Sequence, residues 1–161
     1  MSYRIGKGID FHKLEEGLPL VIGGVTIPSA KGALAHSDGD VLLHAICDAI
    51  LGALALGDIG EHFPNSDPSL KGINSLILLE RTIALMKEKQ FILVNIDSNI
   101  CLETPKIKPY VSMMQQQVAR VTGLSITDIS IKATTTEKLG AIGRTEGLMA
   151  EAVVLMRKQA D

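Results

Sequence analysis

The segment from Val41 to Leu56 is the feature that most restricts how this chain can fold. Its composition is strongly helical and apolar almost all round, and the polar exceptions are Asp40, His44 and Asp48. A helix of this kind has no face suited to water, so we expect it to lie inside the molecule. The three polar residues recur every four positions and form one stripe, and burying them is costly unless each finds a partner or a metal.

Other segments predict a sheet against which this helix can pack. We expect extended structure at 3–12, 20–27, 129–133 and 148–157, with a turn or bulge at Gly23-Gly24 in the second of these. Two more helices are expected at 74–89 and 110–122, the latter closed by Gly123. The order of elements predicts the α/β class: an α+β sandwich with a mixed sheet of about four strands, helices on one face and a short N-terminal hairpin.

The segment from Phe91 to Leu102 alternates in the way expected of a strand with one wet face. One side carries Val94, Ile96, Ser98, Ile100 and Leu102, and the other carries Asn95, Asp97 and Asn99. No repeat or linker divides the chain, so residues 1–161 are predicted to form a single catalytic domain.

Charge and composition argue against several classes of function. The net charge is −2, aromatic residues make up 3% of the chain and Trp is absent, which disfavours nucleic-acid binding. No apolar run is long enough to span a bilayer and the N-terminus has no signal pattern, so we expect a cytoplasmic protein, or an organellar one without its leader. Cys47 and Cys101 lie in apolar segments and are expected to be buried, reduced thiols.

Three residues form a candidate metal site. Asp10 and His12 are separated by one residue and so share a face of the first strand, and His44 belongs to the polar stripe of the apolar helix. Two His and one Asp leave a fourth position open on a tetrahedral Zn²⁺, which is typical of a catalytic site with substrate as the fourth ligand. Alternatively, Asp10 caps a strand end, His12 lies on the surface, and His44 is a core histidine bonded to Asp40 or Asp48.

Two segments are suited to binding phosphate. His36 and Ser37 precede the N-terminus of the helix that carries His44, where backbone N–H groups and the helix dipole favour an anion. The run from Lys132 to Gly140 contains three consecutive threonines, and Glu137 there could hold a second hard cation. Plain helix capping by Ser37 or Asp38, and a strand end running into a helix, are the alternatives.

Two loops give weaker signals. Residues 58–60 and 63–67 could bind a polyol, or could be a solvated turn, and residues 102–108 form a rigid basic loop that could face a nucleobase or phosphate. The glycines at 140, 143 and 147 do not match a dinucleotide fingerprint, so we expect no nicotinamide cofactor.

Taken in order, five blocks of sequence resemble one known family. These blocks are residues 8–12, residues 35–40 with His44, residues 55–60, residues 63–64 with 67–68, and residues 132–140. Together they resemble the 2-C-methyl-D-erythritol 2,4-cyclodiphosphate synthase family over essentially the whole chain. The resemblance implies an enzyme of the non-mevalonate isoprenoid pathway, a phosphorus-oxygen lyase. It would cyclise 4-diphosphocytidyl-2-C-methyl-D-erythritol 2-phosphate and release CMP.

The resemblance also implies roles for individual residues. The metal ligands would be Asp10, His12 and His44 for Zn²⁺ or another divalent metal, with Glu137 helping to hold Mg²⁺ or Mn²⁺ between the phosphates. His36 and Thr135 would steady the transition state. Contacts to the cytidine-diphosphate-linked substrate would come from Asp10, His12, His36, Ser37, Asp58, Ile59, Gly60, Phe63, Pro64, Asn65, Ser66, Asp67, Leu102, Glu103, Thr104, Pro105, Lys106, Ile107, Lys108, Thr134, Thr135, Thr136, Glu137, Ala141 and Arg144.

The resemblance further implies a homotrimer with active sites between subunits, and no nucleic-acid or membrane partner. The chain departs from the family pattern at two places. Asn65 stands where Asp is common, which puts one hydroxyl contact in doubt. Ala141-Ile142 precedes Arg144 where some members have an aromatic residue and a hydroxyl, which puts phosphate or isoprenoid binding near the trimer axis in doubt.

Two other functions fit the same residues. A metal-dependent phosphohydrolase would use the same ligands but would give a linear product. A zinc-stabilised binding module would need a closed site of four ligands, and neither cysteine has a suitable spacing to the Asp10–His12 pair.

Overall fold

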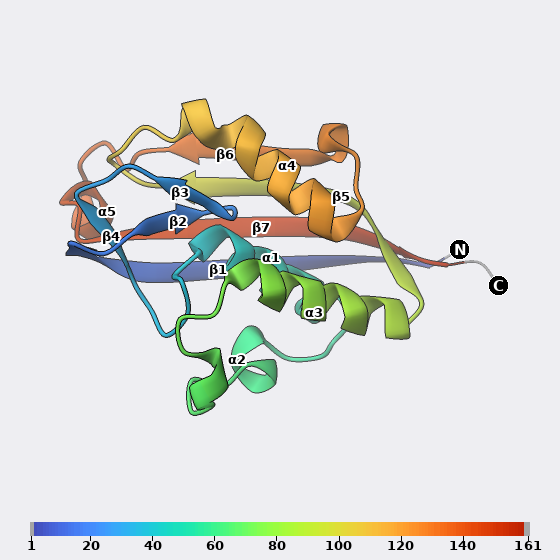
Figure 1. The fold of residues 1–161 in the computed structure, drawn as a ribbon. Coiled ribbons are helices and arrows are strands. Elements are labelled where there is room, and N and C mark those ends of the chain that lie inside the picture. Colours follow the sequence, from blue (N-terminus) through green and yellow to red (C-terminus); the bar gives the residue numbers. More distant parts are fainter. Residues whose placement is uncertain (1, 160–161) are drawn as a thin grey trace.

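A long antiparallel pair of strands runs through the middle of the sheet. In the computed structural model, which describes residues 2–159, β1 (Tyr3–Glu16) pairs with β7 (Gly147–Lys158) from Tyr3 opposite Arg157 to Lys13 opposite Gly147. The five-stranded sheet has the order β4-β1-β7-β5-β6 (Figure 1). Its other strands are β4 (Lys31–Leu34), β5 (Phe91–Cys101) and β6 (Ile129–Thr134), and only the β5–β6 pair is parallel.

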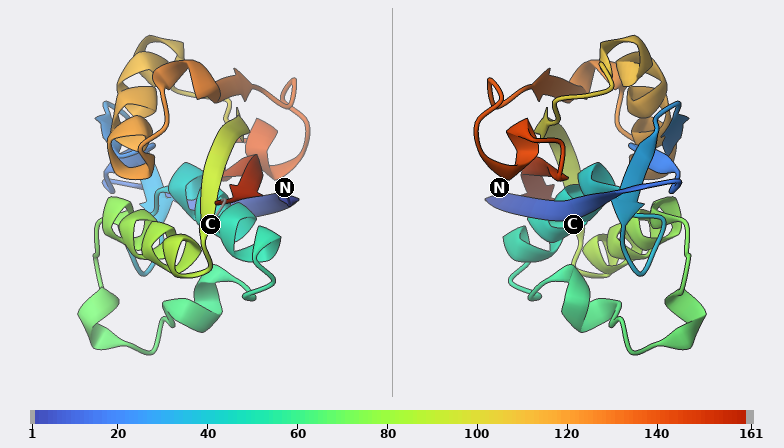
Figure 2. Two further views of the ribbon diagram at one scale, coloured as in Figure 1. Left: turned by 90° about the vertical axis from the view of Figure 1, so that its right-hand side faces the viewer. Right: turned by 90° about the vertical axis from the view of Figure 1, so that its left-hand side faces the viewer.

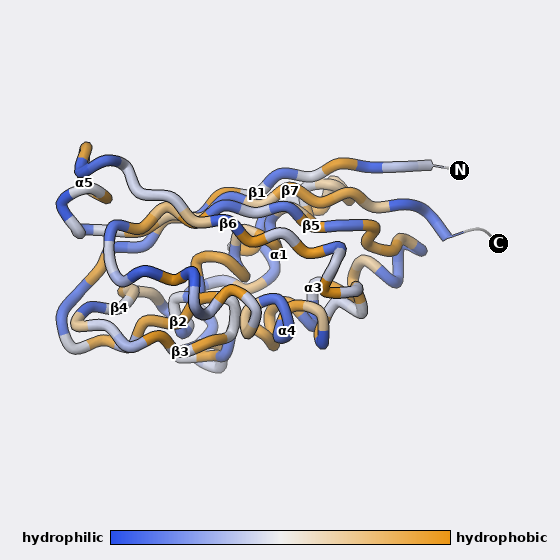
Figure 3. The backbone as a smooth tube through the Cα atoms, turned by 90° about the horizontal axis from the view of Figure 1, so that it is seen from above, coloured by the Kyte–Doolittle hydropathy of each residue, from blue (hydrophilic) through white to orange (hydrophobic). Residues whose placement is uncertain are grey.

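The main helices cover one face of this sheet. They are α1 (Val41–Ala53), α3 (Ser75–Glu88) and α4 (Val111–Thr122), and Figures 2 and 3 show them on the same side of the strands. A separate two-stranded hairpin, β2 (Leu20–Ile22) with β3 (Val25–Ile27), lies beside them. Short helices complete the description: α2 (Ile59–His62), α5 (Gly140–Gly143), and the 3-10 turns Pro68–Leu70, Lys108–Tyr110 and Ile126–Asp128.

Helix α1 packs directly on the backbone of β1 where that face of the strand carries the glycines Gly6 and Gly8. A β-carbon at Gly6 would lie 1.8 Å from the Ala49 carbonyl oxygen, and one at Gly8 would lie 2.0 Å from that of Ala45. The neighbouring strand β7 offers small residues at Ala150 and Ala152. Close contact buries α1 almost completely and forms the centre of the hydrophobic core.

Asp40 joins the hairpin to the start of α1. Its carboxylate is fully buried and accepts hydrogen bonds from the backbone N–H groups of Gly23 (2.9 Å), Gly24 (2.6 Å) and Leu43 (3.0 Å). Gly23 and Gly24 both have positive φ, which suits the tight turn between β2 and β3. The residue that caps α1 is therefore Asp40, not Ser37 or Asp38 as the capping alternative expected, and the same carboxylate also positions the hairpin.

The predicted mixed sheet, the helices on one face and the hairpin at Gly23-Gly24 are confirmed, with three differences. The sheet has a fifth strand, β4, a short edge strand whose sequence has no alternating pattern. Helix α1 ends at Ala53 rather than Leu56, because the chain turns at Ala55, where φ is 56°. Val94 does not share the buried side with Ile96, because a register shift between Leu93 and Asn95 turns the strand there.

None of the main helices α1, α3 and α4 covers the other face of the sheet (Figure 3), and within residues 2–159 this face leaves large apolar side chains exposed. It carries Ile5, Ile9 and Phe11, whose exposed fractions are 72%, 47% and 59%. An ion pair between Lys7 and Glu151 (3.3 Å) crosses the same face. Among the described residues, no helix is both long and apolar enough to cross a membrane.

Candidate active site

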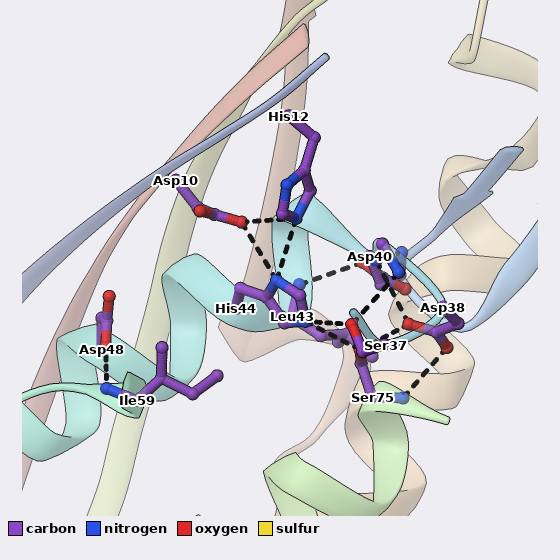
Figure 4. A network of polar contacts seen from close by, with 12 residues as sticks. Asp10, His12, Ser37, Asp38, Asp40, Leu43, His44, Asp48, Ile59 and Ser75 are labelled. Carbon is purple, nitrogen blue, oxygen red and sulfur yellow. Dashed lines mark hydrogen bonds and ion pairs between the residues drawn. The ribbon is translucent and has the colours of Figure 1, made fainter. Parts of the chain in front are cut away.

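Strand β1 and helix α1 bring three predicted ligands together. Asp10 and His12 follow Gly6 and Gly8 on the face of β1 that meets α1, and His44 projects from α1 toward them (Figure 4). Asp10 Oδ2 lies 3.0 Å from both His12 Nε2 and His44 Nδ1, and the two ring nitrogens are 3.1 Å apart. The candidate ligand atoms all lie within 4.8 Å of one another, so the group could hold a metal ion.

The electrostatics of the group favour an ionised carboxylate. Burial by itself raises the pKa of Asp10, but hydrogen bonds and charge from His12 and His44 outweigh it and hold that pKa below its usual value. Burial lowers the pKa of His44, and the Asp10 hydrogen bond together with the charges of Asp10, Asp40 and Asp38 reverses the shift, so that this pKa is raised. Two imidazoles and one carboxylate are a donor set that suits Zn²⁺, and these residues therefore fit the predicted metal.

Two of the alternative interpretations are wrong. His12 has a side chain only 15% exposed and takes part in the group, so it is not a surface residue. The His44 ring forms no hydrogen bond with the side chain of Asp40 or Asp48: the Asp40 carboxylate accepts from the hairpin, and Asp48 accepts from the Ile59 N–H at 2.7 Å. The polar stripe of α1 is thus satisfied residue by residue.

The sequence did not predict which residues form hydrogen bonds with Nε2 of His44, the ring nitrogen that points away from Asp10 and His12. His44 Nε2 lies 2.9 Å from Ser75 Oγ and 3.1 Å from Ser37 Oγ. Ser75 is fully buried at the start of α3, and Asp38 accepts hydrogen bonds from both its N–H (2.9 Å) and its hydroxyl. No sequence signal singled out Ser75, since a serine after the capping residue Asn74 is an ordinary helix start.

A cavity of about 350 Å³ opens beside the three ligands. His36 belongs to its lining, and its Nε2 lies 3.4 Å from the carbonyl oxygen of Asp67. Its lining residues are Asp10, His12, Leu34, Ala35, His36, Ser37, His44, Ile59, Gly60, Phe63, Asn65, Leu70, Ile73 and Leu78. Asp58, Pro64, Ser66 and Asp67 do not line it; Asp58 caps α2 and Asp67 caps the turn Pro68–Leu70.

A second cavity, of about 280 Å³, lies where the parallel strands β5 and β6 end. Its lining residues are Leu102, Glu103, Pro105, Lys106, Ile107, Lys108, Ala133, Thr134 and Thr135. The carboxyl ends of neighbouring parallel strands are a common place for ligand crevices. Thr104 lies outside it and lines a third cavity with Pro105 and Thr145.

Glu103 connects the two loops that form the second cavity. Its Oε1 accepts from the Thr136 N–H (2.9 Å), the Lys138 N–H (3.2 Å) and the Thr136 hydroxyl, which lies 3.0 Å away. Glu137 and Lys138 have positive φ, of 53° and 65°, so the threonine loop has an unusual conformation that these bonds stabilise. Burial opposes but does not outweigh these bonds, which hold the pKa of Glu103 below its usual value.

The chain does not bring all predicted site residues together. The first two cavities share no residue, so His36 and Thr135 belong to different cavities. Glu137 lies outside both, with Oε1 3.4 Å from the Thr135 hydroxyl. Ala141 and Arg144 also lie outside both, and Arg144 pairs with Glu146 at 2.8 Å.

Fold and geometry together define an α/β-sandwich protein with a group that could hold a divalent metal beside one cavity. The YgbB family profile matches residues 3–157. The 2-C-methyl-D-erythritol 2,4-cyclodiphosphate synthase of Syntrophobacter fumaroxidans is 53% identical over 154 residues, which are 96% of this chain and 97% of that protein. The chain therefore belongs to the YgbB family, which confirms the resemblance.

Two solved structures support the same conclusion. The bifunctional IspDF protein of Campylobacter jejuni superposes with a TM-score of 0.94 at 43% identity, over 98% of this chain and 43% of that longer chain. A 2C-methyl-D-erythritol-2,4-cyclodiphosphate synthase in a CDP-bound form superposes with a TM-score of 0.89 at 40% identity, over 96% of this chain and 100% of that chain.

Proposed function

We propose that this chain is a cyclodiphosphate-forming enzyme, a phosphorus-oxygen lyase, and that residues 1–161 form its single catalytic domain. Its substrate is 4-diphosphocytidyl-2-C-methyl-D-erythritol 2-phosphate, and its products are the 2,4-cyclodiphosphate and CMP. The observation that carries the proposal is the convergence of Asp10 Oδ2, His12 Nε2 and His44 Nδ1 beside a cavity, in a chain that matches this family over nearly its full length.

The proposed chemistry needs no nucleophile from the protein. The 2-phosphate of the substrate attacks its own β-phosphorus, and the bond to the CMP phosphate breaks. Asp10, His12 and His44 would hold Zn²⁺, and Glu137 would help to hold Mg²⁺ or Mn²⁺; these cations would supply positive charge that reduces repulsion between the phosphates. The task of the protein is to hold both ends of one molecule close together, which gives the effective molarity of an intramolecular reaction.

The first cavity is suited to the erythritol and its 2-phosphate. Ser37 and His36 can donate hydrogen bonds to phosphate oxygens, and the lining residues Ile59, Gly60, Phe63 and Asn65 are suited to enclose the polyol end. Asn65 lines this cavity and presents an amide where the family commonly has a carboxylate. We propose that His36 stabilises the charge that develops on the reacting phosphate.

The second cavity is suited to the cytidine and the diphosphate. Residues 102, 103 and 105–108 form one wall, and the exposed residues Thr134 and Thr135 belong to the other. The CDP named with a family structure is the same kind of ligand. We propose that Thr135 contacts the β-phosphate and that Glu137 helps to hold the second cation.

Two observations favour a homotrimer with sites between subunits. One substrate must contact both cavities, yet within one chain they share no residue. The uncovered sheet face carries large apolar side chains, including Ile5 and Phe11, of the kind that pack against other copies. Light scattering of the purified protein measures its mass directly, and a monomeric mass would contradict this assembly.

Phosphorus NMR with the diphosphocytidyl substrate, Mg²⁺ and Zn²⁺ tests the reaction. We expect a cyclic diphosphate and CMP from the wild type, a loss in His44→Ala, and no change in the exposed control Asp128→Asn. CMP with a linear product would indicate a phosphohydrolase. Absence of turnover with zinc still bound would favour a zinc-stabilised binding module.

A further inference from the structure

A chain of hydrogen bonds lies behind His44, on the side away from Asp10 and His12. His44 Nε2 is 2.9 Å from Ser75 Oγ, and the Ser75 hydroxyl in turn donates to Asp38 Oδ1. The Ser75 N–H donates to the other carboxylate oxygen of Asp38 at 2.9 Å. Ser75 is 0% exposed and His44 is 8% exposed, so water cannot replace these partners freely.

The number of available protons determines which group donates in each of these hydrogen bonds. A serine hydroxyl has one proton, and a carboxylate such as Asp38 can only accept. Because the Ser75 proton points to Asp38, the oxygen of Ser75 presents only lone pairs to His44. Two lone pairs at 2.9 Å would repel each other, so His44 Nε2 must carry a hydrogen and donate it.

The proton on Nε2 decides which atom of His44 can bind a metal. Nδ1 is the nitrogen that faces Asp10 Oδ2 (3.0 Å) and His12 Nε2 (3.1 Å). With Nε2 held as a donor, Nδ1 is the ring nitrogen that gives up its proton and presents a lone pair. Hydrogen bonds of this kind fix the tautomer and ring orientation of ligating histidines.

We propose that Ser75 and Asp38 are positioning residues of the metal site, which keep the proton of His44 on Nε2 and so present Nδ1 to Zn²⁺. The proposal rests on the proposed zinc site and adds two residues from outside it. Ser75 belongs to α3 and Asp38 to the loop before α1, so the pair also couples the orientation of the His44 ring to the packing of these helices. Ser37 Oγ, 3.1 Å from Nε2 and accepting from the Gly39 N–H at 3.2 Å, is a secondary acceptor for the same proton.

Zinc affinity of Ser75→Ala tests the proposal without substrate. Its matched control is Ser98→Ala, because Ser98 is also buried (1% exposed) and donates one hydrogen bond, to the Ser130 carbonyl at 2.8 Å, but lies on β5. In competition with a chromophoric chelator, we expect Ser75→Ala to bind Zn²⁺ about 10- to 100-fold more weakly. Ser98→Ala should bind Zn²⁺ as the wild type does, although it is also destabilised.

A second measurement does not depend on any variant. Nitrogen-15 NMR of the histidine rings in zinc-loaded wild type should find the proton of His44 on Nε2. A proton on Nδ1, or equal zinc affinity in the two serine variants, would overturn the role of Ser75 while leaving the enzyme assignment intact. A wild type that binds no Zn²⁺ would overturn the metal site itself and this role with it, whatever the turnover assay gives.

Discussion

Gly8 on β1 and Ala45 on α1 are so close that a β-carbon at Gly8 would lie 2.0 Å from the Ala45 carbonyl oxygen. Asp10 is the next residue on the same face of β1, and His44 precedes Ala45 on the helix. The distance between strand and helix at Gly8 therefore sets the distance between two of the candidate metal ligands.

A side chain at Gly8 should separate the strand from the helix. We expect Gly8→Ala to lower the free energy of unfolding by about 1–3 kcal/mol or more, and to weaken zinc binding as well. The control is Gly52→Ala on the exposed side of α1, where the nearest atom to a new β-carbon is 3.9 Å away. Gly52→Ala should stabilise the protein by up to about 1 kcal/mol. Urea unfolding of both variants measures the free energy of unfolding. A Gly8→Ala protein as stable as the wild type would refute the close packing of α1 against β1 at Gly8.

Loss of the Glu103 carboxylate should loosen the threonine loop. We expect Glu103→Ala to bind CDP on the order of 10-fold more weakly, and Glu103→Gln to retain most of the affinity because its amide oxygen can still accept from Thr136. Calorimetry with CDP measures this, with Glu88→Ala at the exposed end of α3 as the control. If Glu103→Ala bound CDP as tightly as Glu88→Ala does, the loop would not depend on Glu103.

Because the pKa of Glu103 is lowered, the stabilisation of the threonine loop by its carboxylate should persist through mildly acidic pH. It should disappear only as the pH falls through that lowered pKa.

Asp40 should make stability depend on pH. Burial raises its pKa from 3.8 to about 6, against the hydrogen bonds from Gly24, Leu43 and Gly23 that lower it. The folded state thus holds this proton more tightly than the unfolded chain does. The contribution of this protonated carboxyl group to the free energy of unfolding is complete below about pH 4. It is lost as the pH rises through about 6, which is a change of roughly 3 kcal/mol. Urea unfolding measures this at several pH values across the range. Over the range, the free energy of unfolding should fall by about that amount more in the wild type than in Asp40→Asn. The same pH dependence in both proteins would contradict this prediction.

The two thiols should differ in reactivity. Burial raises the pKa of Cys47 to about 12, and its side chain is fully buried; burial also raises the pKa of Cys101, which is 9% exposed. We expect iodoacetamide at mildly alkaline pH to leave Cys47 unlabelled in the native protein and to label both residues in urea. Mass spectrometry follows the labelling, and Cys101 should react first. Rapid labelling of Cys47 in the native protein would show that α1 is not as deeply buried as described above.

Local patterns predicted most of the elements. The apolar helix from Val41, the helix beginning after Asn74 and the helix closed by Gly123 are all where composition and capping residues indicated. The missed strand β4 is short and lies at the edge, so its pairing with β1 leaves no pattern in its own sequence. The bulge after Leu93 depends on the register with β7, which one strand by itself does not reveal.

Local patterns were enough to propose Asp10, His12 and His44 as metal ligands, because the spacing of Asp10 and His12 on a strand and the isolation of His44 on an apolar helix are local properties. Tertiary structure alone decided that these three meet, since their contact depends on the close approach of α1 to β1 at Gly8. It also decided that Ser75, 31 residues away from His44, orients its ring. The division of the predicted site residues between two cavities that share no residue is likewise a result of the packing. The position of a side chain in space depends on elements far apart along the chain.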